Sequence, residues 1–166
     1  MSLEEKISKI KLLLLDVDGV LTDGSIILVG ANEEIKVFHI HDGLGIKLAQ
    51  ANGIEVGIIT GRSSEAVKRR CAELAINLLY EGRQNKLEAY EQIKRQLQLH
   101  DEEIAYVGDD LPDLPILKKA GLSCAVNDAR EEVKAVAAFV THRPGGKGAV
   151  REVIELILKH QGKWDF

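Results

Sequence analysis

The sequence predicts an α/β fold built on a doubly wound parallel sheet, and three observations support this. Short apolar runs alternate with segments whose apolar residues recur at helical spacing, as in sheets covered by helices on both faces. The runs are almost entirely apolar, as in residues 12–15, which is typical of strands buried on both faces. A length of 166 residues, 45% of them hydrophobic, suits a single domain, 1–166, with a substantial core.

The expected elements follow one another in regular order. Strands are predicted at residues 12–15, 55–60, 77–80, 104–108, 122–126 and 139–141. Helices are predicted at residues 43–52, 64–74, 86–97, 112–120, 129–136 and 149–160. The last helix is the clearest, because five of its apolar residues form a single stripe with a period of 3.6.

One segment, residues 24–40, interrupts the alternation. Residues 26–29 and 35–40 flank the turn-forming sequence Gly30-Ala31-Asn32, so we expect a protruding β-hairpin after the first strand. The apolar side chains of this hairpin are numerous for an arm that projects into water. A large exposed apolar surface usually marks an interface, so we expect the hairpin to contact other subunits.

Composition excludes several classes of protein. The formal charge of −4 gives no electrostatic basis for binding nucleic acid or an anionic membrane. The apolar run 12–15 is far shorter than the roughly 20 residues of a membrane helix, and the N-terminus lacks a signal-peptide pattern. The two cysteines, Cys71 and Cys124, suit a reducing compartment better than a disulfide framework. We expect a cytoplasmic protein with no nucleic-acid or membrane partner.

Polar residues suited to phosphate chemistry follow three of the predicted strands. Asp16 and Asp18 end the first strand, and one such carboxylate can attack phosphorus while the other transfers protons. Thr60 and Gly61 end the second strand, where a hydroxyl and a backbone N–H can hold phosphate oxygens.

The other polar residues of this kind suit charge neutralisation and metal binding. Lys86 begins a helix and can neutralise a phosphate. Asp109, Asp110 and Asp113 follow the fourth strand and offer the carboxylate oxygens that Mg²⁺ prefers.

Each of these signals alone has an ordinary structural explanation: a turn, a helix cap, a solvated lysine or an acidic loop. Their common position is what favours catalysis. A parallel sheet brings the carboxyl ends of its strands to one edge, where ligands bind in such folds. The sequence therefore predicts a site for phosphoryl transfer at that edge.

The same segments resemble a known family. DVDGVLTD, TGR, the pair Asn85-Lys86 and VGDDLPD are similar to the four ordered motifs of the haloacid dehalogenase superfamily of Mg²⁺-dependent phosphatases. FHIHDGLGIKLA and PGGKGAVREVIELIL resemble its capless sugar-phosphatase branch. The resemblance implies a Rossmann-like fold without a cap domain, Mg²⁺ as cofactor and a homotetramer.

The resemblance also implies roles for the matching residues. Asp16 would be the nucleophile and a metal ligand, and Asp18 the general acid and base, with its carbonyl on the metal. Asp109 would be the third metal ligand, supported by Asp110 and Asp113. Thr60, Gly61 and Lys86 would hold the transferring phosphoryl group. These assignments agree with the charge neutralisation and positioning that phosphoryl transfer requires.

The implied substrate is a small sugar-acid phosphate, 3-deoxy-D-manno-octulosonate 8-phosphate, which yields the Kdo of lipopolysaccharide. The family's substrate pocket matches His39, Ile40, His41, Asp42, Gly43, Lys47, Arg62 and Arg70. Cations suit a substrate that carries both a carboxylate and a phosphate. For Arg70, a solvated helix face is an equal alternative. His39 and His41 are two positions apart and, on a strand, should face the same side. With no third soft ligand nearby for a metal site, we expect them to line the pocket or the surface.

Two other functions stay open at this point. The chain could hydrolyse another sugar-acid phosphate, such as a nine-carbon sialate-type 9-phosphate. It could also be a non-catalytic assembly module of the same fold, although such a module has no need of Asp16, Asp18, Lys86 and Asp109 together.

The spacing between the motifs leaves no room for a lid. The stretches from Asp23 to Thr60 and from Arg62 to Lys86 are both too short for a further domain of about 50 residues. We therefore expect the hairpin to help close the sites of partner subunits. Residues 145–148, Gly-Gly-Lys-Gly, lack the spacing of a nucleotide-binding loop, and we interpret them as a flexible entry to the last helix. The tail 161–166 either docks through its aromatic residues or is disordered.

Overall fold

The computed structural model describes residues Met1–Phe166, and its centre is a six-stranded sheet in the order β5-β4-β1-β6-β7-β8. Every pairing between neighbouring strands of this sheet is parallel. The strands are β1 (Leu12–Leu15), β4 (Glu55–Ile59), β5 (Leu78–Tyr80), β6 (Ile104–Gly108), β7 (Leu122–Ala125) and β8 (Phe139–Val140). The predicted parallel sheet is confirmed.

The strand order places a crevice beside β1. The chain adds β4 and β5 on one side of β1 and then returns to add β6, β7 and β8 on the other side. The connections that leave β1 and β6 therefore diverge at the carboxyl end of the sheet. In open α/β sheets this reversal of direction is where ligands bind.

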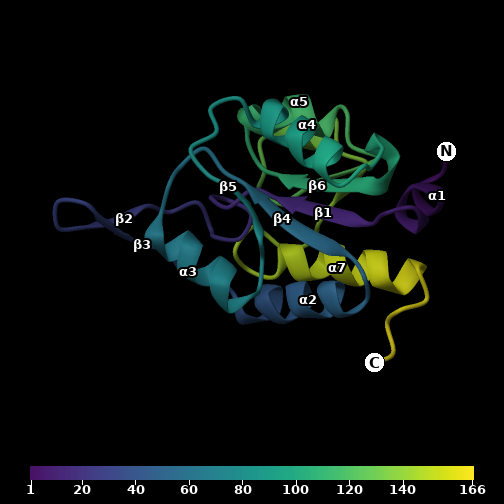
Figure 1. The fold of residues 1–166 in the computed structure, drawn as a ribbon, viewed down its shortest axis with the longest axis horizontal. Helices are drawn as coiled ribbons and strands as arrows, with labels where there is room; N and C mark the ends of the chain where they lie inside the picture. The colour runs from purple at the N-terminus through teal and green to yellow at the C-terminus, as the bar shows by residue number, and fades with distance from the viewer.

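Helices cover the two faces of the sheet. In Figure 1, α2 (Ile40–Ala51), α3 (Glu65–Glu73) and α7 (Ala149–His160) lie on one side of the sheet, and α4 (Lys86–Gln96) and α5 (Leu114–Leu117) on the other. Two further short helices are α1 (Leu3–Ser8) and α6 (Glu131–Lys134), and two 3₁₀ turns are η1 (Asp101–Glu103) and η2 (Leu111–Asp113). None of these helices has the length and apolar character needed to cross a membrane.

The core lies between the sheet and these helices. All four leucines of β1 are fully buried, as expected for a central strand with helices on both faces. The predicted stripe of α7 is buried as well, and α7 packs against α2. Gly45 permits this approach, because a Cβ there would lie only 3.0 Å from Cδ of Arg151 and 3.3 Å from Cδ1 of Ile154.

The hairpin differs from the prediction in its second strand. It consists of β2 (Ile27–Val29) and β3 (Glu33–Ile35), paired antiparallel, and projects from the end of the molecule toward which the sheet strands run (Figure 1). The second strand was predicted to extend to residue 40, but α2 begins at Ile40. His39 is the N-cap of α2, and its Nδ1 accepts a hydrogen bond from N–H of His41. Both histidines therefore belong to a helix start, and the prediction that they share one face of a strand is wrong.

Three short helical segments also differ from expectation. The sequence pattern missed α1, which begins at the capping residue Ser2 and buries only Ile7. The predicted helix 112–120 is interrupted, because η2 precedes the single turn of α5 and Pro115 cannot donate a backbone hydrogen bond. The predicted helix 129–136 shortens to α6.

The C-terminal tail folds back onto its own chain. Nε2 of Gln161 donates hydrogen bonds to the carbonyl oxygens of Ile7 and Ile10, and Trp164 packs against the core. The guanidinium of Arg151 lies 5.2 Å from the Trp164 ring centroid. Of the two alternatives for this tail, the structure supports docking.

We predict that Ile154→Ala lowers the free energy of unfolding by about 2–5 kcal/mol, because it opens a cavity between α7, α2 and the sheet. Guanidinium denaturation measures this loss. Leu3→Ala removes a similar side chain from a position that is 38% exposed, and should cost less than about 1 kcal/mol. Equal losses for the two variants would contradict the described core.

Candidate active site

Asp16, immediately after β1, is the central carboxylate of the site. It is 6% exposed, because β1 is the innermost strand and its carboxyl end opens into the crevice. Its Oδ1 accepts a hydrogen bond of 2.7 Å from N–H of Val17 and lies 3.0 Å from Nζ of Lys86. No hydrogen bond or ion pair involves Oδ2, which leaves this oxygen free for a ligand.

Lys86, the first residue of α4, lies beside Asp16 in the same cavity. Its ammonium lies 3.0 Å from Oδ1 of Asp16 and 2.8 Å from Oδ1 of Asp113, and the residue is only 7% exposed. The alternative of a solvated surface lysine is therefore wrong. The two carboxylates raise the pKa of Lys86 against the opposing effect of burial, so it is a permanent positive charge in the site.

Both carboxylate oxygens of Asp113 are occupied by hydrogen bonds within the protein. Its Oδ1 accepts hydrogen bonds from Nζ of Lys86 and from the Tyr106 hydroxyl at 2.6 Å. Its Oδ2 accepts from the backbone N–H groups of Asp109 at 2.9 Å and Asp110 at 3.2 Å. Asp113 therefore orients the lysine and the loop after β6, and its lone pairs are already occupied.

Tyr106 has no functional signal in the sequence, because its strand IAYVG has the pattern of a buried core strand. Asp110 lies on the rim, where its Oδ1 caps η2 by accepting from N–H of Leu111.

Asp16, Asp109 and Asp113 place oxygen atoms within 4.8 Å of one another. Burial, reinforced by the neighbouring carboxylates, raises the pKa of Asp109 to about 8 and that of Asp16 to about 6. The single ammonium of Lys86 cannot balance the negative charges of three ionised carboxylates. The carboxylate oxygens of Asp16 and Asp109 are hard donors that lie close together, so this site fits Mg²⁺ or a similar divalent cation.

Two glycine contacts hold the loop after β1 in place. Gly19 has a φ of +88°, and a Cβ there would lie 2.0 Å from Oδ2 of Asp109, so only glycine lets this loop approach the carboxylate. Gly145 and Gly146 are buried against the same loop, with a Cβ on Gly145 falling 1.7 Å from the carbonyl oxygen of Gly19. The prediction of a flexible entry at 145–148 is wrong for these two glycines, because they support the loop that carries Asp16.

A cavity of about 230 Å³ opens above these carboxylates. Every residue predicted to hold the phosphoryl group or the metal lines this cavity. Its walls are Asp16, Asp18, Thr60, Gly61, Arg83, Gln84, Lys86, Asp109, Asp110, Pro112 and Asp113. Sequence reasoning missed Arg83 and Gln84, whose only signal was their place just before Asn85-Lys86 in the loop that follows β5.

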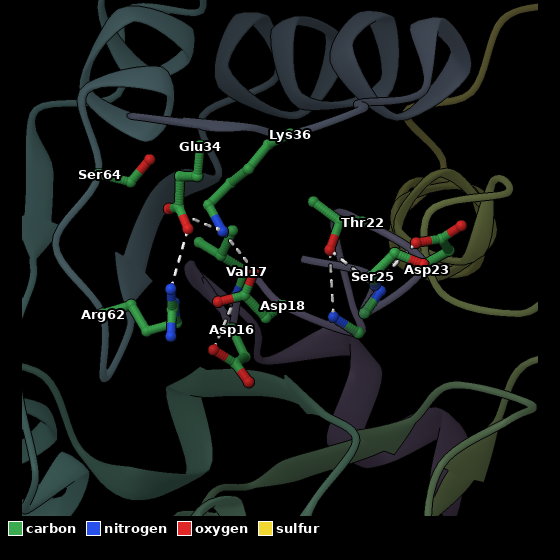
Figure 2. A network of polar contacts seen from close by, with 12 residues as sticks. Asp16, Val17, Asp18, Thr22, Asp23, Ser25, Glu34, Lys36, Arg62 and Ser64 are labelled. Atoms are coloured by element: carbon green, nitrogen blue, oxygen red, sulfur yellow. Dashed lines mark hydrogen bonds and ion pairs between the residues drawn. The ribbon is translucent and has the colours of Figure 1, made fainter. Parts of the chain in front are cut away.

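Asp18 extends the site toward the hairpin. Its Oδ1 accepts a hydrogen bond of 2.6 Å from Nζ of Lys36, the residue directly after β3 (Figure 2). Glu34 lies beside them, with Oε1 at 3.2 Å from Nζ of Lys36 and Oε2 at 2.9 Å from Nη2 of Arg62. Arg62 was expected to bind substrate, and here it faces the hairpin. Lys36 and Glu34 were both missed at the sequence level.

The remaining residues expected to bind substrate lie outside this cavity in the single chain. Asp42 is 1% exposed, and its Oδ1 accepts a hydrogen bond of 2.9 Å from N–H of Arg151, so it caps the start of α7. Gly43 lies against Nη2 of Arg70, which is directed toward the carbonyl oxygen of His39.

The others of this group lie on the surface of α2. Ile40 is 77% exposed, and His41 and Lys47 are exposed as well. The structure therefore brings together the residues for phosphoryl transfer, whereas those expected to bind the sugar lie outside the cavity, some buried within the subunit and others on its surface.

Comparison with known proteins gives a consistent set of relatives. A family model described as haloacid dehalogenase-like hydrolase matches residues 78–154. The 3-deoxy-D-manno-octulosonate 8-phosphate phosphatase KdsC of Salmonella typhi is 51% identical over 160 residues, which is 96% of this chain and 85% of the relative.

Solved structures agree with this result. The Moraxella catarrhalis 3-deoxy-D-manno-octulosonate 8-phosphate phosphatase, in complex with magnesium ion, phosphate ion and a KDO molecule, is 44% identical with a TM-score of 0.95, covering 98% of this chain and 93% of that one. The cobalt-bound YrbI phosphatase of Haemophilus influenzae is 42% identical with a TM-score of 0.94, covering 97% and 96%.

The raised pKa values predict a pH-dependent stability in metal-free protein. The folded chain holds protons on Asp16 and Asp109 that the unfolded chain releases near pH 4, so the free energy of unfolding should fall as pH rises from about 5 to about 8. Denaturation after chelation measures this slope. Asp109→Asn should flatten it, and Mg²⁺ should stabilise the unsubstituted chain more at about pH 8 than at about pH 5. A stability that rises over this range in both chains would contradict the described charge cluster.

Proposed function

The chain belongs to the haloacid dehalogenase-like hydrolases, and we propose that it is a Mg²⁺-dependent phosphatase that hydrolyses 3-deoxy-D-manno-octulosonate 8-phosphate to Kdo and inorganic phosphate. The observation that carries this proposal is the convergence of Asp16, Asp109 and the buried Lys86 on one cavity at the end of β1. The 51% identity to a phosphatase of this specificity supports the choice of substrate.

In the first step, an oxygen of Asp16 attacks the phosphorus atom. The bond between phosphorus and the sugar oxygen breaks, and its electron pair leaves with that oxygen, which takes a proton from Asp18. The product is an aspartyl-phosphate on Asp16. Because Asp16 is fixed by N–H of Val17 and by Lys86, little reorganisation is needed for in-line attack.

In the second step, the carboxylate of Asp18 removes a proton from water, whose oxygen forms a bond to phosphorus. The bond between phosphorus and Asp16 then breaks, which restores the Asp16 carboxylate and releases inorganic phosphate. Asp18 is suited to both steps, because it lines the cavity and its side chain is 23% exposed, within reach of substrate and water.

The transferring phosphoryl group needs donors and positive charge around its oxygens. Lys86 supplies a buried ammonium, and Thr60 and Gly61, which also line the cavity, offer a hydroxyl and a backbone N–H. Bound Mg²⁺ would be held by carboxylate oxygens of Asp16 and Asp109 and by the carbonyl oxygen of Asp18, and it would offset the repulsion between the nucleophile and the phosphate dianion.

We further propose that the active enzyme is a homotetramer. Most of the residues expected to bind the sugar lie outside the cavity of this subunit, and the hairpin exposes a row of apolar side chains. Ile26, Leu28 and Val37 are 50%, 74% and 63% exposed, respectively. Subunit contacts through the hairpin would cover them and would bring recognition residues from a neighbour, such as those at the start of α2, toward the cavity.

A second candidate substrate is a nine-carbon sialate-type 9-phosphate, because most of the residues expected to bind the sugar lie outside the cavity and do not yet select a chain length. The relatives named above favour the eight-carbon acid. A panel of sugar phosphates with Mg²⁺ distinguishes the two, and much faster turnover of the nine-carbon phosphate would overturn the proposed specificity.

We predict that Asp16→Asn reduces turnover of 3-deoxy-D-manno-octulosonate 8-phosphate by roughly 10³-fold or more, because the amide is not a nucleophile. Released phosphate measures the rate, and circular dichroism checks the fold. Asp101→Asn is the control, since this carboxylate pairs with Lys94 away from the cavity. Full activity of Asp16→Asn would remove it as the nucleophile.

A second prediction concerns assembly. Leu28→Asp places a charge on the most exposed apolar side chain of the hairpin and should yield smaller assemblies with poorer discrimination among sugar phosphates. Light scattering gives the mass, and the substrate panel gives the discrimination. A variant that stays tetrameric, or an active monomer with unchanged selectivity, would refute the proposed role of the hairpin.

A further inference from the structure

The contact between Lys36 and Asp18 is the feature of this molecule that the proposed mechanism does not yet use. Lys36 directly follows β3. Its side chain is only 2% exposed, although most side chains of the hairpin are exposed. Burying an ammonium without partners is costly, so such a lysine is found where acidic groups hold it. Here the partners are Oδ1 of Asp18 at 2.6 Å and Oε1 of Glu34 at 3.2 Å.

These residues form a chain of alternating charges. Asp18 pairs with Lys36, Lys36 with Glu34, and Glu34 with Arg62 (Figure 2). This series of ion pairs connects the loop after β1, the hairpin and the loop after β4, and its formal charges sum to zero. Each member therefore has a counter-charge, and the position of Lys36 is fixed from both sides.

We propose that Lys36 is a positioning residue for the general acid and base Asp18; this inference rests on the proposed phosphatase function. The ammonium binds one oxygen of Asp18 and leaves Oδ2 without a partner in a residue that lines the cavity. A carboxyl group held at one oxygen by a rigid, buried partner keeps its other oxygen in a defined place for proton transfer.

The charge of Lys36 also acts in the same step. As Asp18 gives its proton to the leaving sugar oxygen, negative charge develops on its carboxyl group. A fixed ammonium at 2.6 Å stabilises that charge in a partly dehydrated site and needs no reorganisation. The hairpin is thus part of the catalytic apparatus of its own subunit, whatever surfaces it contributes to a neighbour.

Substrates that differ in their need for a proton on the leaving group test this role. The oxygen of a sugar phosphate must be protonated as it leaves, whereas p-nitrophenolate leaves without a proton. We expect Lys36→Met to lower kcat/KM for 3-deoxy-D-manno-octulosonate 8-phosphate by about 10²-fold and that for p-nitrophenyl phosphate by less than about threefold. Lys36→Arg should recover part of the loss, because it keeps a cation beside Asp18.

The aryl substrate also reports whether the variant is folded. Lys9→Met is the matched control, since Lys9 forms an ion pair of 3.0 Å with Glu102 outside the cavity, and it should leave both rates unchanged. If Lys36→Met does not fold, Glu34→Gln removes the outer support of Lys36 and should show the same selective loss with a smaller amplitude.

An equal loss on both substrates, or no loss on either, would overturn the role of Lys36. Failure of the proposed function itself looks different, because the unsubstituted chain would then not turn over the sugar phosphate at all.

Discussion

The whole site depends on one electrostatic constraint: three carboxylates share a small buried volume with a single ammonium. Asp16, Asp109 and Asp113 would repel one another strongly at this distance, and the chain keeps them there by different means. Each oxygen of Asp113 accepts two hydrogen bonds, and Lys86 pairs with both Asp113 and Asp16. The negative charge that remains on Asp16 and Asp109 is what a divalent cation would offset.

Much of the fold serves this arrangement. The sheet order brings the ends of β1 and β6 side by side, so residues 93 positions apart in the chain meet without any dedicated element. Close packing then fixes the loops, since Gly19 approaches Asp109 and Gly145 approaches Gly19 more closely than any side chain would allow. Lys36, directly after the second strand of the hairpin, forms an ion pair with Asp18. This contact anchors the base of the hairpin to the site.

The sequence was sufficient for the sheet and for the residues expected to hold the phosphoryl group and the metal, because both signals are local. Strand ends are visible as apolar runs that stop at polar residues, and parallel topology brings those ends together. Residues that act through tertiary contacts were not visible. Tyr106 has the pattern of any core residue of its strand, and Lys36 has that of a solvated lysine. Only the folded structure shows their contacts with Asp113 and Asp18. Asp42 caps a helix that lies 109 residues further along the chain. Its place in a motif gave no hint of that contact.

Trapping the covalent intermediate shows whether Asp16 attacks phosphorus. A single turnover of 3-deoxy-D-manno-octulosonate 8-phosphate with Mg²⁺, quenched and reduced with borohydride, converts an aspartyl-phosphate to homoserine, which peptide mass spectrometry locates. We predict homoserine at position 16 and none after chelation of the metal. Turnover with no homoserine at position 16, or with the product at another carboxylate, would contradict it.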